Sequence, residues 1–416
     1  KGDDNRDPAE IALWRKRDPI PIMEARLSAQ VVRRIRMSVK RSVAAALKKA
    51  DASPFPVRED ISLPVEAQKL ACDRMPVPFA STDTTVSRSL GEALQQLLAE
   101  DERVVLLGED IVDPYGGAFK VTRGLSSVFP GRVLATPISE AGIVAWGVGM
   151  AILGMRPVAE IMFGDFIALA ADQLVNHAAK YRWMYGDSVE VPLVIRTPMG
   201  GRRGYGPTHS QCLEKIFMGI PGLTVVAPSR LLDCGELLRR TVLRSEGPVL
   251  FVEHKLLYAQ RMAVAVDGRL GEFSIRATDG RYPTVRLSLV AFERPDIAIV
   301  CYGENCSLGM EAAKVLLVEH EIVADVIVPA LVAPLPTEEI LAYIGDCGAV
   351  ATIEEGTRAF GWGSELVAVL SERGDMPRRY VRFGALECPI PASRPLEEGV
   401  LPDVPSIVRK LGGLRI

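Results

Sequence analysis

The sequence predicts an α/β protein with two domains and a helical extension in front of them. From residue 84 onward, short apolar segments alternate with segments of helical periodicity, whereas residues 1–50 show helical periodicity alone. Short buried strands that alternate with helices are typical of a doubly wound parallel sheet. We therefore expect a helical tail at 1–50, a linker at 51–83, a first α/β domain at 84–265, a connector at 266–291 and a second, smaller α/β domain at 292–416.

The composition is that of a globular protein that binds neither nucleic acid nor a membrane. The chain has 416 residues, is 48% hydrophobic and carries a net charge of −3, so no strong overall field attracts it to a polyanion. Seven cysteines without a CxxC pair argue against a disulfide framework and a zinc site, and fit a reducing cytoplasm. No apolar run reaches membrane-spanning length, and the first residues do not resemble a signal peptide. Because the chain does not begin with Met, we expect it to start inside a longer polypeptide.

The helical tail contains two predicted helices of different character. Asp7 is suited to cap the first helix, Pro8 fits its first turn, and Asp18-Pro19 interrupts it. The second helix, residues 29–50, has no acidic residue and seven basic ones: Arg33, Arg34, Arg36, Lys40, Arg41, Lys48 and Lys49. It is either a solvated helix face or a helix that lies on an acidic partner surface, and the sequence leaves both open. Five prolines between residues 51 and 83 predict a linker or an extended arm.

The first α/β domain opens with a helix that contains Leu90, Leu94, Leu97 and Leu98 at helical spacing. Short apolar runs then predict buried strands, and longer periodic runs predict helices. The expected strands are 104–107, 157–162, 192–196, 223–227 and 249–253, and the expected helices are 143–153, 166–183 and 231–244.

The second domain repeats this alternation in a shorter chain. The expected strands are 297–302, 324–328, 349–354 and 379–383, and the expected helices are 307–319, 337–344 and 364–373. The connector before it, 266–291, has no regular pattern.

Two residues are candidates for chemistry on position alone. His209 lies in a glycine-rich loop, residues 200–211, that follows a predicted strand. Loops at the carboxyl ends of parallel strands are where α/β proteins bind ligands, and histidine can transfer protons near neutral pH. Glu140 follows a strand and opens a helix, where it is either an acid stabilised by the helix dipole or a catalytic group. Spacing alone shows no Walker loop, metal cluster or Ser-His-Asp arrangement.

Several motifs that occur in one order carry a resemblance to a known family. They are residues 107–110 (LGED), 116–125 (GGAFKVTRGL), 136–140 (TPISE), 172–180, 208–211 (THSQ), 221–223 (PGL) and 354–356 (EEG). Together they resemble the beta subunit of the thiamine-dependent first component of 2-oxo acid dehydrogenase complexes, of the pyruvate, branched-chain and acetoin types, over about residues 84–416. The resemblance implies a pyrimidine domain of the thiamine-diphosphate-binding fold, followed by a transketolase C-terminal-like domain.

The helical tail resembles a different part of the same enzymes. Residues 14–20 and 50–54 are similar to the carboxyl-terminal end of the alpha subunit, which implies a fused alpha–beta chain. The family's diphosphate and magnesium motif, Gly-Asp-Gly followed by Asn, belongs to the alpha subunit and is absent here. The resemblance therefore implies that this chain supplies the pyrimidine-binding half of the site and needs an alpha half, which binds magnesium, for activity.

The resemblance also implies roles for individual residues. Glu140 matches the glutamate that hydrogen-bonds the aminopyrimidine ring of thiamine diphosphate, and Phe166 matches the aromatic residue that stacks on it. Ile138 and Met162 match positions that line the ring, and His209 matches a histidine near the substrate. The implied reaction is oxidative decarboxylation of a 2-oxo acid with acyl transfer to lipoamide on a lipoyl-bearing acyltransferase.

A potassium site is a further implication. Leu193, Val242, Ser245 and Gly247 match positions that hold a structural potassium ion, largely through backbone oxygens. Ser245 stands where several relatives have Asp, which is a departure from the family pattern.

Three alternatives remain open at this stage. The chain could be part of a transketolase or a 1-deoxyxylulose-phosphate synthase, a non-catalytic scaffold subunit, or an enzyme that delivers an acyl group to a biosynthetic carrier. The loop at 208–211 and the alpha-like tail favour the dehydrogenase. The resemblance further implies an assembly of two alpha and two beta parts, with a homodimer formed through the beta halves and the small-residue helix near 142–154 as a candidate for that contact.

Overall fold

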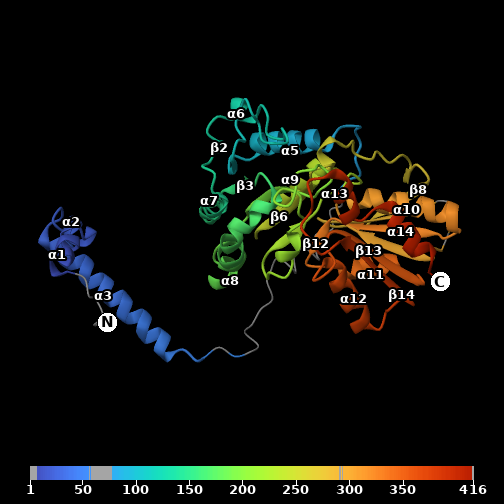
Figure 1. Ribbon diagram of the computed structural model, residues 1–416. Helices are drawn as coiled ribbons and strands as arrows, with labels where there is room; N and C mark the ends of the chain where they lie inside the picture. The colour runs from blue at the N-terminus through green and yellow to red at the C-terminus, as the bar shows by residue number, and fades with distance from the viewer. Residues whose placement is uncertain (1–6, 56, 58–76, 290–291, 293, 415–416) are drawn as a thin grey trace. The chain divides into compact units, whose positions relative to one another are not determined.

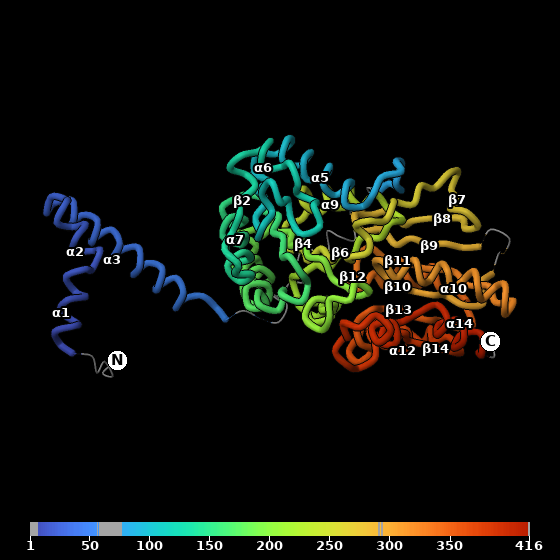
Figure 2. Tube along the Cα trace, turned by 45° about the horizontal axis from the view of Figure 1, so that its top comes forward, coloured from blue at the N-terminus to red at the C-terminus, as the bar shows by residue number. Residues whose placement is uncertain are grey.

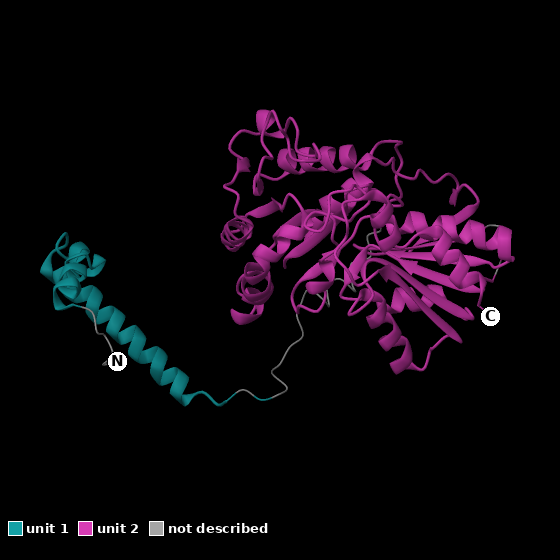
Figure 3. Cartoon of the chain, viewed as in Figure 1, with its two compact units in different colours: residues 1–62 teal, residues 63–416 magenta. Residues whose placement is uncertain are grey.

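The computed structural model describes residues 7–55, 57, 77–289, 292 and 294–414. The chain forms two compact units, residues 1–62 and 63–416 (Figure 3). The greater part of the expected linker, residues 58–76, lies outside the described residues.

The described part of the first unit contains three helices, one more than the two that the sequence predicts. They are α1 (Pro8–Lys16), α2 (Pro19–Glu24) and α3 (Ala29–Ala52). The side chains of Asp7, Asp18 and Ser28 each accept a backbone hydrogen bond at the start of their helix. Asp18-Pro19, expected only as a break, therefore also starts a helix of its own.

The first sheet of the second unit has seven strands in the order β12-β5-β6-β4-β3-β1-β2. Six of them are parallel, in agreement with the predicted doubly wound sheet. The seventh, β12, comes from the later part of the chain and pairs antiparallel with β5 at the sheet edge. The strands are β1 (Val104–Gly108), β2 (Val133–Ala135), β3 (Arg156–Glu160), β4 (Val194–Met199), β5 (Thr224–Val226), β6 (Val249–His254) and β12 (Leu331–Ala333).

Helices cover both faces of this sheet (Figure 1). Alternate strand residues point to opposite faces, so Leu106 packs in one buried cluster and its neighbour Leu107 in another. The cluster of Leu106 includes α5 (Val86–Glu100) and α9 (Cys234–Arg244), whereas the cluster of Leu107 includes α7 (Glu140–Ile152). The short helix α6 (Leu125–Val128) was not predicted, and β2 was expected only as the strand before Glu140, without bounds, because three or four residues leave no periodic signal.

The sequence predicted one regular helix at 166–183, and this was wrong. The segment consists of three successive helices of different type. A 3-10 helix η2 (Gly164–Ala170) leads into a π-helix η3 (Gln173–Ala178) and then into α8 (Ala179–Met184). A 3-10 turn and a π turn each differ from an α turn by less than one residue, so periodicity over such short segments could not separate them.

The second sheet also has seven strands, in the order β14-β13-β10-β11-β9-β8-β7 (Figure 2). The first four are parallel and the last three antiparallel. The stretch at 266–291, expected as an irregular connector, thus contains three strands. Its arginines and serines alternate with buried residues, so a search for apolar runs did not detect the strands. The strands are β7 (Arg269–Leu270), β8 (Phe273–Ala277), β9 (Thr284–Leu289), β10 (Ile297–Cys301), β11 (Ala324–Pro329), β13 (Ala349–Thr357) and β14 (Arg379–Ala385).

Helices again cover both faces of the second sheet. Buried residues of α10 (Asn305–His320) and α14 (Val404–Gly412) share one cluster, and those of α11 (Thr337–Ile344) and α12 (Trp362–Arg373) share the other. A short helix, α13 (Arg394–Val400), precedes α14. Neither α13 nor α14 was predicted. Among the described residues, no helix combines the length and the apolar character that crossing a membrane requires.

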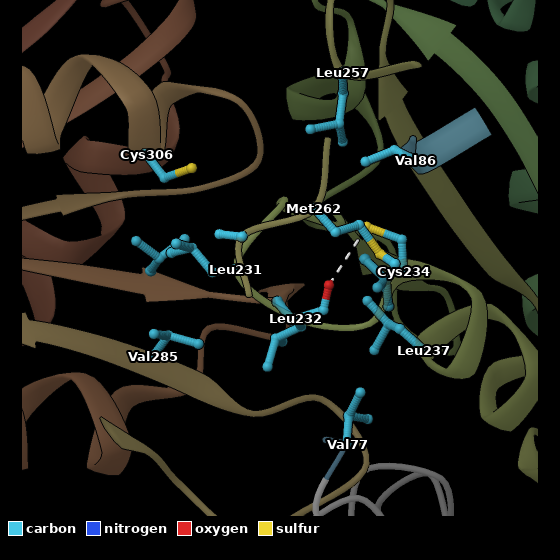
Figure 4. Close-up of a cluster of buried hydrophobic side chains, with 14 of the residues drawn as sticks. Val77, Val86, Leu231, Leu232, Cys234, Leu237, Leu257, Met262, Val285 and Cys306 are labelled. Atoms are coloured by element: carbon cyan, nitrogen blue, oxygen red, sulfur yellow. Dashed lines mark hydrogen bonds between the residues drawn. The ribbon is translucent and has the colours of Figure 1, made fainter. Parts of the chain in front are cut away.

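One buried cluster joins the two sheets of the second unit. Figure 4 shows side chains from the first domain, such as Val86 and Leu237, beside Val285 and Cys306 of the second. The thiol of Cys234 lies at its centre, 3.8 Å from the carbonyl oxygen of Leu232. Because a continuous apolar core is stabilised by burial from both sides, the two domains hold each other in place.

Candidate active site

The candidate residues gather at one edge of the first sheet. Parallel strands end at a common edge, and the loops after β2, β3 and β4 there carry Glu140, Phe166 and His209 respectively. The helix that begins with Glu140, α7, packs directly against η2, which contains Phe166. The fold therefore collects at one edge three residues that lie far apart in the sequence.

Glu140 is a buried carboxylate at the first position of α7. The Ser139 side chain accepts the Gly142 N–H and caps this helix. Glu109, which directly follows β1, is buried nearby, and burial together with the negative charge of Glu140 raises its pKa. The Oε1 atom of Glu109 is buried and accepts no hydrogen bond from the described residues. A buried carboxylate oxygen that lacks a donor, beside a second carboxylate, favours a proton or a hydrogen-bond donor at Glu109.

An aromatic cluster surrounds His209. Its imidazole meets the ring of Phe166 edge-on, with the ring centroids 5.2 Å apart, and the ring of Phe163 at 4.7 Å. Phe163 in turn contacts Tyr205 and Phe119. These edge-to-face contacts hold the imidazole in a defined orientation.

The hydroxyl of Thr208 orients the same ring from the other side. Its Oγ1 atom lies 3.0 Å from Nδ1 of His209. Since Nδ1 is occupied by this contact, Nε2 is the ring nitrogen that remains to exchange a proton with a ligand.

The two other residues expected to line the cofactor ring are less enclosed. Met162 is half-buried between β3 and η2, whereas Ile138 is 84% exposed on the loop before α7. The structure thus brings Phe166 and His209 into direct contact and places Glu140 near Glu109. Ile138 belongs neither to the aromatic pair nor to the carboxylate pair.

A buried ion network lies behind the aromatic cluster. Arg196 on β4 donates to Glu253 at 2.7 and 2.8 Å and to Glu160 at 2.9 Å. Burial alone would lower the pKa of Arg196, but the charges of Glu253 and Glu160 raise it. Tyr258 also donates to Glu253 and stacks on Phe119, with centroids 4.7 Å apart. The network therefore links three neighbouring strands to the aromatic cluster.

Lys255 is a second buried cation at this edge. Its Nζ atom donates to the Gly200 carbonyl oxygen at 2.8 Å and lies 5.6 Å from the centroid of the Phe163 ring. Burial lowers its pKa. The contact with Phe163 is a cation–π interaction, which fixes the ring that touches His209.

Two of the four residues expected to hold potassium, Val242 and Ser245, accept hydrogen bonds from a cationic side chain through their carbonyl oxygens. The Arg156 guanidinium donates to the carbonyl oxygens of Val242 at 2.7 Å and Ser245 at 3.1 Å. The Leu193 carbonyl accepts the N–H of Val249 at 2.9 Å. Each carbonyl oxygen keeps a second lone pair, but the guanidinium places a positive charge at these oxygens, which repels a further cation. Within the described ranges, no group of three or more His, Cys, Asp or Glu side chains is arranged to hold a metal ion.

Several residues of the site were not found from the sequence. Glu109, Phe163, Tyr205 and Lys255 all lie within a few residues of a strand end or of a residue that was predicted. Their closeness in sequence to strand ends and to predicted residues was the only hint of a role in the site. Which of these neighbouring side chains turn toward His209 is visible only from the packing.

Comparison with known proteins agrees with the fold and its two domains. The family model described as the transketolase pyrimidine-binding domain matches residues 83–260, and the transketolase C-terminal domain matches residues 289–407. A solved structure titled "Split gene transketolase, inactive beta4 tetramer" aligns with a TM-score of 0.60 at 23% identity, and covers 78% of this chain and 96% of that one. This structural likeness shows the fold.

Similarity to curated proteins is more specific. The beta subunit of the mitochondrial pyruvate dehydrogenase E1 component of Saccharomyces cerevisiae is 34% identical over 338 residues, or 80% of this chain and 89% of that protein. The beta subunit of the acetoin:2,6-dichlorophenolindophenol oxidoreductase of Cupriavidus necator is 32% identical over 342 residues, or 78% and 95%. The chain therefore belongs to the family of beta subunits of the E1 component of 2-oxo acid dehydrogenases, with transketolase-like pyrimidine and C-terminal domains.

Proposed function

We propose that this chain supplies the pyrimidine-binding half of a thiamine-diphosphate-dependent 2-oxo acid dehydrogenase, which decarboxylates a 2-oxo acid and transfers the acyl group to lipoamide. The observation that carries the proposal is the joint position of Glu140, Phe166 and His209. They lie at one sheet edge, on loops after β2, β3 and β4, in a chain of this family.

The carboxylates at this edge fit an aminopyrimidine ring. Such a ring presents an exocyclic amine that donates hydrogen bonds and ring nitrogens that accept a proton. The buried Oε1 atom of Glu109 accepts no hydrogen bond from the described residues, and the nearby negative charge of Glu140 adds to the cost of ionising Glu109. A ring that brings donors would satisfy the buried oxygen and relieve the repulsion between the two charges.

When bound, thiamine diphosphate supplies the nucleophilic carbon and the electron sink that decarboxylation needs. Glu140 holds a proton shared with the pyrimidine ring and so favours its imino form. Phe166 offers an aromatic face to the ring. His209, with Nδ1 held by Thr208, moves a proton at Nε2 during acyl transfer.

The diphosphate end of the cofactor requires a second protein part. The sequence lacks the family's diphosphate and magnesium motif. We therefore assign magnesium to an alpha half, carried on the same or a separate polypeptide. Residues 7–55, which are helical and resemble an alpha subunit's end, fit a fused alpha–beta arrangement.

The outer surface of α7 is suited to a contact between beta halves. Its solvent-facing residues are small or apolar: Gly142, Ala145, Trp146, Gly149, Ile152 and the following Leu153. Trp146 is 45% exposed and Leu153 85% exposed, so this apolar face is open to solvent as far as the described residues of the second unit show. We propose that a second beta half covers it in an assembly of two alpha and two beta parts.

Product analysis tests the proposed reaction. The chain and its alpha half are incubated with thiamine diphosphate, magnesium and a panel of 2-oxo acids, with a lipoyl domain as acceptor. The proposal predicts carbon dioxide and acylated lipoyl domain. Ketose transfer between sugar phosphates without carbon dioxide release would instead show a transketolase-type enzyme, and no turnover of any substrate would show a non-catalytic subunit.

A further inference from the structure

The loop that carries His209 is hydrogen-bonded to the second domain by two carboxylates. The Gly201 N–H donates to Oε1 of Glu355 at 2.6 Å. The Arg202 and Gly204 N–H groups donate to the two oxygens of Glu397, at 2.7 and 3.0 Å. Three backbone donors within four residues of the loop thus end on side chains of β13 and α13.

The backbone of this loop has the form of an anion-binding concavity. Arg202 has a φ of +65° and Gly204 a φ of +68°, in the left-handed region. Turns of this kind point successive N–H groups toward a common centre, which attracts an anion. The carboxylate of Glu397 fills that centre. A non-glycine residue such as Arg202 adopts this conformation at an energetic cost, so the surrounding contacts must hold it there.

The fit between the loop and the second domain is close. A Cβ atom on Gly201 would lie 2.9 Å from Leu401, and one on Gly206 would lie 3.3 Å from Ala392. The Arg202 guanidinium donates to the Pro402 carbonyl oxygen at 2.5 Å. The loop therefore lies directly against the segment from 392 to 402, which contains α13.

Glu355 is itself held by a histidine of the first domain. Nδ1 of His254 accepts the Leu256 N–H at 3.2 Å, so the ring proton is on Nε2, which donates to Glu355 at 3.1 Å. Burial opposes ionisation of Glu355, but His254, Arg202 and the Gly201 N–H lower its pKa to about 2. Glu355 is therefore an anion near neutral pH and a strong acceptor for the loop.

The opposite end of the loop is fixed to the element that carries Phe166. Gln211 donates to Oδ1 of Asp165 through its side chain at 3.0 Å and its backbone N–H at 3.3 Å. His209 lies between this attachment and the carboxylate contacts. We propose that Glu397 and Glu355 are positioning residues of the second domain, which fix the 200–211 loop so that His209 stays against Phe166; their effect on the reaction rests on the proposed function.

The first test measures the loop itself and needs no cofactor. Amide hydrogen exchange of the full chain, resolved within residues 200–211, is compared for the wild type, Glu397→Ala and Glu397→Gln. Loss of a charge-assisted acceptor predicts exchange at Arg202 and Gly204 that is faster by about 10- to 100-fold in Glu397→Ala, with a smaller effect in Glu397→Gln. Glu398→Ala is the control, since Glu398 lies on the same helix but is exposed, and among the described residues its ion pair is with Arg394 at 2.8 Å.

If Glu397→Ala does not fold, the isosteric Glu397→Gln decides the question alone. Faster exchange that is confined to the 200–211 loop supports the proposal. Exchange in β1 and α5, which serve as internal references, should be unchanged. Unchanged protection of Arg202 and Gly204 in a folded Glu397 variant would overturn it, whether or not the enzyme decarboxylates any substrate.

The second test asks whether Glu397 acts through His209. The complete enzyme with its alpha half is assayed as wild type, Glu397→Ala, His209→Ala and the double variant. A positioning role predicts that Glu397→Ala lowers kcat by about tenfold or more in the wild-type background and by much less when His209 is already absent. Equal losses in both backgrounds would show a general structural effect and contradict the proposal. Glu398→Ala is expected to leave kcat and KM unchanged.

Discussion

The imidazole of His209 lies edge-on against the ring of Phe166, with their centroids 5.2 Å apart. The two residues come from loops after neighbouring strands, and each is held by further rings or hydrogen bonds. Because neither ring can turn without breaking those contacts, the pair offers a ligand a fixed aromatic face and a fixed imidazole.

Binding of thiamine diphosphate is expected to need the alpha half. In the proposed site this chain contacts the pyrimidine ring, and none of its family motifs is the one that binds the anionic diphosphate. Calorimetric titration of thiamine diphosphate with magnesium should show weak or undetectable binding to this chain and clear binding to the complex with the alpha half. Equal affinity in the two samples would contradict the assignment of the diphosphate site to the alpha half.

The outer face of α7 can be tested without disturbing the fold. A Cβ atom added at Gly149 meets no atom within 4 Å, so Gly149→Leu changes the surface only. We expect the wild type to sediment as a dimer at micromolar concentration and Gly149→Leu to shift toward the monomer, because the close approach is blocked. Gly219→Leu is the control, since Gly219 is exposed and also has no atom within 4 Å of an added Cβ. A monomeric wild type would show that this face is not a contact between beta halves.

Removing Arg196 alone from the buried ion network should destabilise the fold strongly, because its two carboxylate partners would remain buried. Arg196→Leu leaves Glu160 and Glu253 buried without their cation. Removing one partner of a buried pair typically lowers the free energy of unfolding by about 3–5 kcal/mol. Urea denaturation should show this loss, whereas Arg88→Leu, which breaks an exposed pair with Glu92, should lower the free energy of unfolding by less than about 1 kcal/mol. Equal effects of the two substitutions would contradict the prediction.

Glu354 should make stability depend on pH near neutrality. Burial raises its pKa from 4.5 to about 7, although the Gly363 and Trp362 N–H groups oppose the rise. Between these values the folded chain binds a proton that the unfolded chain has released. The contribution of Glu354 to the free energy of unfolding is therefore fully present below about pH 4.5 and is lost as the pH rises to about 7, by roughly 3 kcal/mol.

The variant Glu354→Gln removes this dependence. Denaturation curves between pH 4.5 and 7 should show a shallower slope for Glu354→Gln than for the wild type. Glu365→Gln, an exposed substitution in α12, the helix whose Trp362 and Gly363 N–H groups donate to Glu354, should keep the wild-type slope. If Glu354→Gln and the wild type had the same free energy of unfolding at every pH, the assignment would be contradicted.

Periodicity and turn residues predicted most helices and strands, because burial on one face leaves a regular trace in the sequence. The prediction was wrong where that trace is weak. The strands β8 and β9 alternate polar and apolar residues, and the turns η2 and η3 share the apolar spacing of an α-helix. Neither failure could be corrected from local pattern, since pairing partners and hydrogen-bond register depend on the rest of the fold.

The candidate site likewise contains residues that the sequence predicted and residues that it did not. His209 and Glu140 stood out because each follows a predicted strand, and the family resemblance added Phe166. Glu397 could not be found in this way, because it lies on a helix that was not predicted, 188 positions after His209 in the printed sequence. Its contact with the loop depends on how the two domains pack, which no local pattern records.

Glu140→Gln tests the central claim most directly. Glutamine keeps the size of the side chain and can accept a hydrogen bond, but it cannot share an acidic proton with the pyrimidine ring. The measurement is carbon dioxide release from a 2-oxo acid by the complex with the alpha half, for the wild type, Glu140→Gln and the exposed control Glu365→Gln. Our account predicts that Glu140→Gln slows release by about 10²- to 10⁴-fold with an unchanged unfolding curve, and that Glu365→Gln matches the wild type. Wild-type rates of carbon dioxide release from Glu140→Gln would contradict it.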